Sequence, residues 1–284
     1  MTRTARIMAV AAALAMLAGR ALTAVPAGRL EVKLGVCDWT IGKSGDPAAL
    51  ALAGKLGLDG VQVSLNVKEG RLALTDPALR RAYLEASEKT GVAIASFAIG
   101  ELNNVPLKSD PRAEKWLAEG IDIARAMNIG LILVPFFGKG ELRNDAPGLE
   151  AVVLALRRLA PRAEAAGVVL ALESYLNAAD NLRILERVGS GAVRVYYDVG
   201  NSQAVGDPIL DEIRRLGGRI AEIHAKDTKD LYGKGSMDFV SVRRALEDIG
   251  YRGWLVLEGT ETPLGVEASV RYDADYLKSV FAGK

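Results

Sequence analysis

The most constraining feature of this sequence is a repeated alternation of short β-branched runs with longer segments of helical period, which begins at Leu30. Each run is almost continuously apolar, as strands buried on both faces of a parallel sheet are. The alternation therefore predicts βα units around a parallel sheet. The eight expected strands are 32–37, 60–65, 92–97, 131–136, 168–173, 193–198, 219–224 and 254–259.

The segments between these runs carry helix start and stop signals. DPALRRAYLEASEKTG (76–91) has Asp at the cap, Pro in the first turn and Gly at the stop. Segments 110–130 and 147–167 follow the same pattern, and Pro161 is expected to kink or divide the second. Eight units over about 250 residues predict the α/β class and a single (β/α)8 TIM barrel over 30–284. A doubly wound sheet is the alternative, because sequence does not show strand order.

The N-terminus differs from the rest of the chain. Arg3 and Arg6 precede an apolar stretch over 7–17, and small residues follow near 22–27. This pattern predicts a secretory signal peptide over residues 1–24, and hence export, to the periplasm. The alternative is an Ala-rich amphipathic tail on a cytoplasmic protein. The apolar stretch is short for a membrane span, so no stable span is expected in the mature chain.

The composition limits the classes of molecule that this protein is expected to bind. Lys and Arg number 36 against 35 Asp and Glu, and no basic cluster carries interleaved aromatics, so nucleic-acid binding has no electrostatic support. A small molecule is the expected partner. The sequence does not decide whether the chain forms a homo-oligomer. Cys37 is the single cysteine, so an internal disulfide is excluded. Its side chain is expected to be a small buried hydrophobe.

The last four expected strands end in residues that bind hard metal ions. These are Glu173, Asp198, His224 and Glu258, separated by 25, 26 and 34 residues, so each belongs to its own βα unit. Active sites of TIM barrels lie at the carboxyl ends of the strands, where these side chains would meet. Three carboxylates and one imidazole suit one divalent ion such as Mn²⁺, Mg²⁺ or Co²⁺. Alternatively, each carboxylate caps the next helix and the histidine is a satisfied core residue.

Residues near the ends of the earlier strands are candidates for binding a sugar. Aromatic faces pack on the C–H faces of sugars and amides suit hydroxyls. Trp39, Gln62, Glu101 and Phe136 are the expected substrate contacts in this half of the barrel. Their neighbours Asp38, Ser64, Asn103 and Phe137 are further candidates for the pocket lining. The alternative for Trp39 and Phe136 is that they cover the barrel core.

Four segments together resemble one family. LALESYLN, VYYDVGNS, IHAKDT followed by YGKGSMDF, and WLVLEGTE are similar to the sugar phosphate isomerase/epimerase family of xylose isomerase-like TIM barrels. The resemblance implies that Glu173, Asp198, His224 and Glu258 bind the metal and that the two glutamates also exchange protons with the substrate.

The sequence departs from the ketose 3-epimerases at two positions. Asn201 stands where those enzymes carry a substrate-binding histidine, and Lys226 is a nearby cation where they use an arginine a few residues further on. Asn201 and Lys226 are therefore added to the expected substrate contacts, with a geometry that differs from that of an arginine.

These observations predict a metal-dependent sugar isomerase or epimerase. It would abstract the proton α to the carbonyl of a keto sugar through an enediolate, with Glu173 and Glu258 as acid and base. One alternative is a lyase or dehydratase that eliminates from a keto sugar or 3-keto glycoside. A second is a non-catalytic sugar-binding barrel. Export would favour unphosphorylated substrates.

Overall fold

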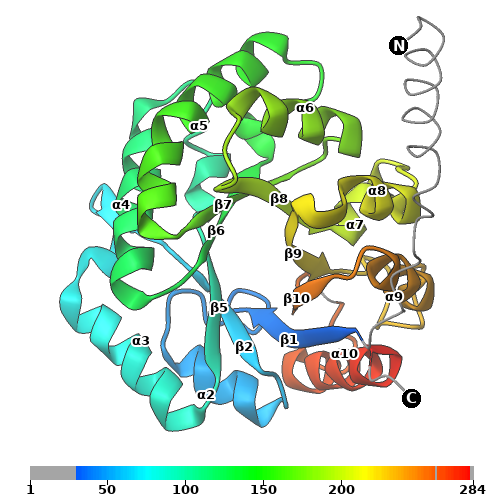
Figure 1. Ribbon diagram of the computed structural model, residues 1–284. Coiled ribbons are helices and arrows are strands. Elements are labelled where there is room, and N and C mark those ends of the chain that lie inside the picture. Colours follow the sequence, from blue (N-terminus) through cyan, green and yellow to red (C-terminus); the bar gives the residue numbers. More distant parts are fainter. Residues whose placement is uncertain (1–29, 260, 282–284) are drawn as a thin grey trace, which may run out of the picture.

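The computed structural model describes residues 30–259 and 261–281. The predicted signal peptide lies outside these residues. Eight parallel strands form a closed barrel in the order β1-β10-β9-β8-β7-β6-β5-β2, and helices surround them (Figure 1). Closure confirms the predicted (β/α)8 barrel and excludes the doubly wound sheet.

All eight predicted strands are present, each within two residues of its expected start and end. They are β1 Glu31–Cys37, β2 Gly60–Ser64, β5 Ala93–Ala98, β6 Leu131–Phe136, β7 Val169–Ser174, β8 Val193–Asp198, β9 Ile220–Ala225 and β10 Arg252–Leu257. β1 pairs in parallel with β10 on one side and with β2 on the other. The first and last strands therefore close the barrel together.

The main helices are α2 Ala48–Lys55, α3 Pro77–Thr90, α4 Pro111–Met127, α5 Ala146–Ala166, α6 Ala178–Val188, α7 Val199–Ala204, α8 Ile209–Leu216, α9 Phe239–Asp248 and α10 Val266–Phe281. α3 begins and ends as predicted, because Asp76 accepts a hydrogen bond from the backbone N–H of Ala78 and Gly91 ends the helix at φ 70°. α5 continues through Pro161 as one assigned helix, so the expected division is wrong. A two-stranded hairpin of β3 Val67–Lys68 and β4 Arg71–Leu72, which the sequence pattern did not predict, follows β2.

The core has two layers that follow from strand alternation. Phe97, Ile132 and Leu170 belong to a large cluster that includes side chains from the helices. The next residues along the same strands, Ala98, Leu133 and Ala171, form a second cluster with Tyr196. Because successive side chains of a strand point to opposite faces, this second cluster lies inside the barrel. Its small residues leave room near the carboxyl ends of the strands.

Within the described residues, no helix is long and apolar enough to cross a bilayer.

Candidate active site and metal centre

Four neighbouring strands bring the predicted ligands together. Glu173 lies in β7, Asp198 ends β8, His224 lies in β9 and Glu258 directly follows β10. Asp198 and His224 are paired across the β8–β9 ladder, and His224 is paired with Val256 of β10. One candidate ligand atom from each of the four side chains lies within 4.8 Å of the others.

His224 faces the three carboxylates with one ring nitrogen. Its Nδ1 lies 3.0 Å from Oε1 of Glu173, 3.8 Å from Oδ2 of Asp198 and 3.9 Å from Oε2 of Glu258. The histidine is fully buried, and its other nitrogen, Nε2, points away from the cluster toward Gln62 at 2.9 Å. One imidazole nitrogen and three carboxylates therefore converge on one point.

The two carboxylate oxygens of Asp198 contact different partners. Its Oδ1 accepts a hydrogen bond of 2.9 Å from the backbone N–H of Asn201 and so caps α7, as one of the alternatives from the sequence expected. Its Oδ2 faces His224 and lies 3.4 Å from Nζ of Lys226. Capping and membership of the cluster are thus compatible, because a carboxylate has two oxygens.

The protonation of the cluster follows from burial and charge. Burial raises the pKa of Glu173 to about 7, although His224 acts to lower it. Burial by itself would raise the pKa of Asp198, but His224 and Lys226 leave it lowered. Burial acts to lower the pKa of His224, yet the surrounding acidic groups raise it well above the ordinary value. In the metal-free protein, protons on these side chains therefore balance part of the buried negative charge.

The donor set fits a divalent ion. Oxygen ligands with one imidazole match the preferences of Mn²⁺, Mg²⁺ and Co²⁺ better than those of soft ions, which favour thiolates. A divalent ion would also balance the charge of the three buried carboxylates, in place of the protons on the cluster and the ammonium group of Lys226.

A cavity of about 370 Å³ opens beside the cluster. Trp39, Glu101, Glu173 and Glu258 are among the residues that line it, so two predicted sugar contacts and both predicted proton carriers face the same space. The indole Nε1 of Trp39 donates to Oε1 of Glu258 over 3.4 Å. The remaining lining residues are Ser44, Ser64, Asn66, Val67, Ala98, Gly100, Asn103, Leu133, Pro135 and Phe137.

Asn201 and Lys226, the other two expected contacts at this end, touch the ligands themselves. Nδ2 of Asn201 donates to Oε1 of Glu173 over 3.2 Å, and Nζ of Lys226 donates to Oε2 of Glu258 over 2.7 Å. Lys226 also lies 3.3 Å from Oδ1 of Asn201. Both side chains therefore contact the candidate ligands directly.

The structure places Phe136 elsewhere. Its side chain is 1 % exposed and belongs to the large cluster that includes helix side chains, while its neighbours Pro135 and Phe137 line the cavity. We therefore correct its expected position: an alternation of one residue puts Phe137, not Phe136, at the cavity. Gln62 is also absent from the cavity lining, because it lies fully buried below His224.

Two buried polar side chains were missed. The ring of Tyr196 lies tilted against that of His224, with centroids 4.3 Å apart, and Glu222 is a 1 % exposed acid in β9. Burial raises the pKa of Glu222 to about 7. The signal for Glu222 was present, because a residue two positions before an inward-facing strand residue points to the same side.

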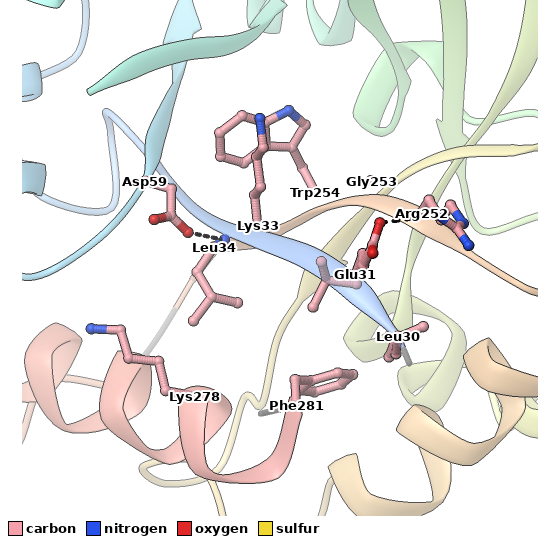
Figure 2. A pocket seen from close by; sticks show the side chains of 11 residues that line it. Leu30, Glu31, Lys33, Leu34, Asp59, Arg252, Gly253, Trp254, Lys278 and Phe281 are labelled. Carbon is pink, nitrogen blue, oxygen red and sulfur yellow. Dashed lines mark hydrogen bonds and ion pairs between the residues drawn. The ribbon is translucent and has the colours of Figure 1, made fainter. Parts of the chain in front are cut away.

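A larger cavity, of about 730 Å³, lies at the opposite end of the barrel (Figure 2). It is lined by the first residues of β1 and β10 and by α10. Among its charged residues, Arg252 contacts Glu31 at 2.9 Å, Lys33 lies over the ring of Trp254, and Asp59 accepts a hydrogen bond from the backbone N–H of Leu34. Catalytic groups of TIM barrels lie at the carboxyl ends of the strands, so the smaller cavity is the candidate active site.

Fold and cluster together define a (β/α)8 barrel with a carboxylate–imidazole cluster that could hold a metal ion at the carboxyl ends of its strands. Residues 50–280 match the family described as "Xylose isomerase-like TIM barrel", and the chain belongs to that family.

Named relatives and solved structures agree with this assignment. The chain is 34 % identical over 203 residues to a 2-epi-5-epi-valiolone 7-phosphate 2-epimerase from an Actinoplanes species, a match that covers 70 % of this chain and 73 % of the relative. D-psicose 3-epimerase from Clostridium cellulolyticum superposes with a TM-score of 0.73 at 18 % identity, over 88 % of this chain and 99 % of that one. A 3-keto-D-glucoside 4-epimerase from E. coli has a TM-score of 0.73 at 17 % identity, over 88 % and 100 %.

Proposed function

We propose that this protein is a metal-dependent sugar isomerase or epimerase that removes the proton α to a carbonyl of a keto sugar. The observation that carries the proposal is the convergence of four ligand atoms within 4.8 Å beside a cavity of about 370 Å³. That volume is at the lower end of the range for small-molecule sites. The relatives named as sugar epimerases support an isomerase-class enzyme.

The four ligands divide into two pairs by their access to substrate. Glu173 and Glu258 line the cavity, whereas Asp198 and His224 are buried and are absent from its lining. A divalent ion held by the four side chains supplies positive charge that makes the α-proton of a nearby keto sugar easier to remove. Glu173 and Glu258 come from β7 and the end of β10, so they reach the cavity from different strands. One would take the proton and the other would return it.

The lining also suggests the substrate class. Its charged members are Glu101, Glu173 and Glu258, and none of the described residues that line the cavity is Lys or Arg. Lys226, the nearest cation to the ligands, is already paired with Asp198 and Glu258. Apart from the proposed ion, the charged side chains that a phosphate would meet here are all negative, whereas hydroxyls would find amides, hydroxyls and carboxylates. We propose an unphosphorylated sugar, even though the relatives found by sequence similarity are named for phosphorylated substrates, a valiolone 7-phosphate in one and L-ribulose 5-phosphate in others.

The test is product analysis in D₂O. Full-length protein loaded with Mn²⁺ is incubated with unphosphorylated ketoses, their phosphates and 3-keto glycosides, and products are followed by mass and NMR. A stereoisomer or aldose–ketose isomer that has gained one deuterium is expected from an unphosphorylated substrate. Loss of water or of an aglycone would instead identify the lyase alternative. Binding without any turnover would leave the non-catalytic barrel.

His224→Ala is the control for the metal. Metal analysis of the wild-type protein is expected to find about one divalent ion per chain, and the variant should retain much less. Metal addition should also raise the melting temperature of the wild-type protein more than that of the variant. Equal metal content in both proteins would contradict ligation by this side chain.

A further inference from the structure

His224 is buried with both ring nitrogens engaged. Nδ1 faces the carboxylates of the cluster, and Nε2 faces Oε1 of Gln62 at 2.9 Å. A neutral imidazole carries one proton, so only one of its nitrogens can offer a lone pair to a metal ion. The group opposite the metal therefore decides whether the ligand nitrogen is available.

The direction of the Gln62 amide is set by its other neighbours. Its Nε2 donates to Oγ of Ser96 over 2.9 Å, and its Oε1 also accepts from the Cys37 thiol over 3.4 Å. Ser96 also acts to lower the pKa of the Glu222 carboxyl, as a hydroxyl that donates toward that acid does, and its oxygen accepts from the amide. The amide carbonyl is thereby directed at the ring of His224.

Burial makes this arrangement hard to reverse. Cys37, Gln62, Ser96 and His224 all have no exposed surface, so water is not available to replace a lost hydrogen bond. If the amide turned over, its NH₂ group would face Nε2 and would require a lone pair there. The proton would then sit on Nδ1, where the carboxylates and the metal lie. A reversed amide would also point its NH₂ group at the thiol of Cys37, so that two donors face each other. An unsatisfied buried donor of this kind costs about 1–3 kcal/mol.

We propose that Gln62 is a positioning residue that keeps the proton of His224 on Nε2 and so leaves Nδ1 free to bind the divalent ion. The inference rests on the metal centre proposed above. It gives Gln62 a role other than the substrate contact that its place near a strand end suggested, and it agrees with the absence of this residue from the cavity lining.

The first test needs no mutation, because the chain contains a single histidine. Untagged full-length protein is labelled with ¹⁵N-histidine, loaded with the diamagnetic probe Zn²⁺, and studied by long-range ¹H–¹⁵N correlation NMR. One spin system is expected, with the proton on Nε2 and the metal on Nδ1. A proton on Nδ1 with the metal on Nε2 would overturn the proposal.

The second test compares three variants at the same nitrogen. Gln62→Met removes the acceptor at similar volume and is expected to weaken Mn²⁺ binding about 10- to 100-fold, measured by calorimetry. Gln62→Glu restores an acceptor oxygen and should recover the Nε2-protonated spectrum. Cys37→Ala is the matched control, because Cys37 lies 3.4 Å from the same Nε2 but is expected to leave the tautomer unchanged.

The outcomes separate this inference from the proposed function. Failure of the wild-type protein to bind Zn²⁺ or Mn²⁺ would overturn the metal centre itself. Normal binding with the Nδ1-protonated tautomer, or a change caused by Cys37→Ala rather than by Gln62→Met, would overturn only the role of Gln62. If Gln62→Met does not fold, the ¹H–¹⁵N spectrum of the wild-type protein still shows which nitrogen of His224 carries the proton.

Discussion

The two glutamates of the site are held differently, although both are candidate ligands. Glu173 is 4 % exposed and contacts His224 and Asn201. The side chain of Glu258 is 17 % exposed and contacts Lys226 and Trp39. Because each has two oxygens, one can face the ion while the other faces the cavity. Their separate surroundings support the proposed division of proton transfer between them.

Glu173→Gln and Glu258→Gln should each keep measurable metal binding and lose turnover by roughly 10²- to 10⁴-fold, because glutamine keeps a ligand oxygen but does not carry the proton. Steady-state rates and metal content are measured side by side, with the exposed Glu261→Gln as control. One of the two variants is expected still to exchange deuterium into the substrate from D₂O, which would identify the base. If both turn over near the wild-type rate while binding metal, Lys226 or Asp227 becomes the next candidate for the base.

Short elements after the strands determine where the charged groups of the site can reach. Asp198 caps α7, and a Cβ built on Gly200 of this helix would lie 2.7 Å from Cγ and 2.8 Å from Cβ of Lys226. Such contacts are shorter than real carbon atoms allow. The glycine therefore lets the lysine pass close to the helix and reach Glu258.

Gly200→Ala should move Lys226 away from Glu258 and Asp198 and should lower stability by about 1–3 kcal/mol. Turnover is expected to fall with it, because the charge balance of the cluster changes. Urea unfolding and steady-state kinetics measure the two effects. Gly191→Ala, where a Cβ meets nothing within 4 Å, is the matched control and should change neither property. A fully active, equally stable Gly200→Ala protein would contradict this account of α7.

α10 carries a buried acid that makes stability depend on pH. Asp273 has no exposed surface, and its Oδ1 accepts from the backbone N–H of Tyr232. Burial raises its pKa to about 7, although that hydrogen bond acts to lower it. The folded protein therefore holds a proton at pH values where the unfolded chain has released it.

The free energy of unfolding of the metal-free protein should consequently fall as the pH rises from about 4 to about 7, by up to about 1.4 kcal/mol per pH unit for this group. Stability from the proton on Asp273 is fully present below the unfolded pKa and is lost above the folded one. Urea unfolding in EDTA across this range measures the slope. Asp273→Asn should flatten it, and an unchanged slope in that variant would place the effect on other acids, such as Glu173 or Glu222.

For the whole molecule, the sequence pattern predicted which way a strand side chain points better than it predicted the layer of the barrel in which that side chain lies. The eight strands and their order along the chain were recognisable because buried parallel strands are nearly continuous apolar runs. The ligands were recognisable because charged side chains end such runs. Gln62 was placed at the wrong depth, since periodicity shows which side chains point inward but not which layer they occupy. Phe136 was displaced by one residue, and a shift of one reverses the face.

We propose that the chain is exported, as its first 24 residues predict, and this has a direct test. Expression of the full sequence in a bacterial host should yield a mature protein that begins near Val25 or Gly28, because small residues precede these positions. Intact-mass measurement of the purified protein gives the start. A protein that retains Met1 in the cytoplasm would contradict export and would weaken the case for an unphosphorylated substrate.

Closure of the barrel by its first and last strands also sets the order in which the site can be completed. β1 finds one of its two neighbours only when β10 has been made, and Glu258 follows β10 directly. Proteins are synthesised from the N-terminus, so a nascent chain offers three of the four candidate ligands until its final segment emerges. Binding of the proposed ion by all four side chains therefore requires synthesis to proceed through Glu258, and a chain that stops before β10 would offer one ligand fewer.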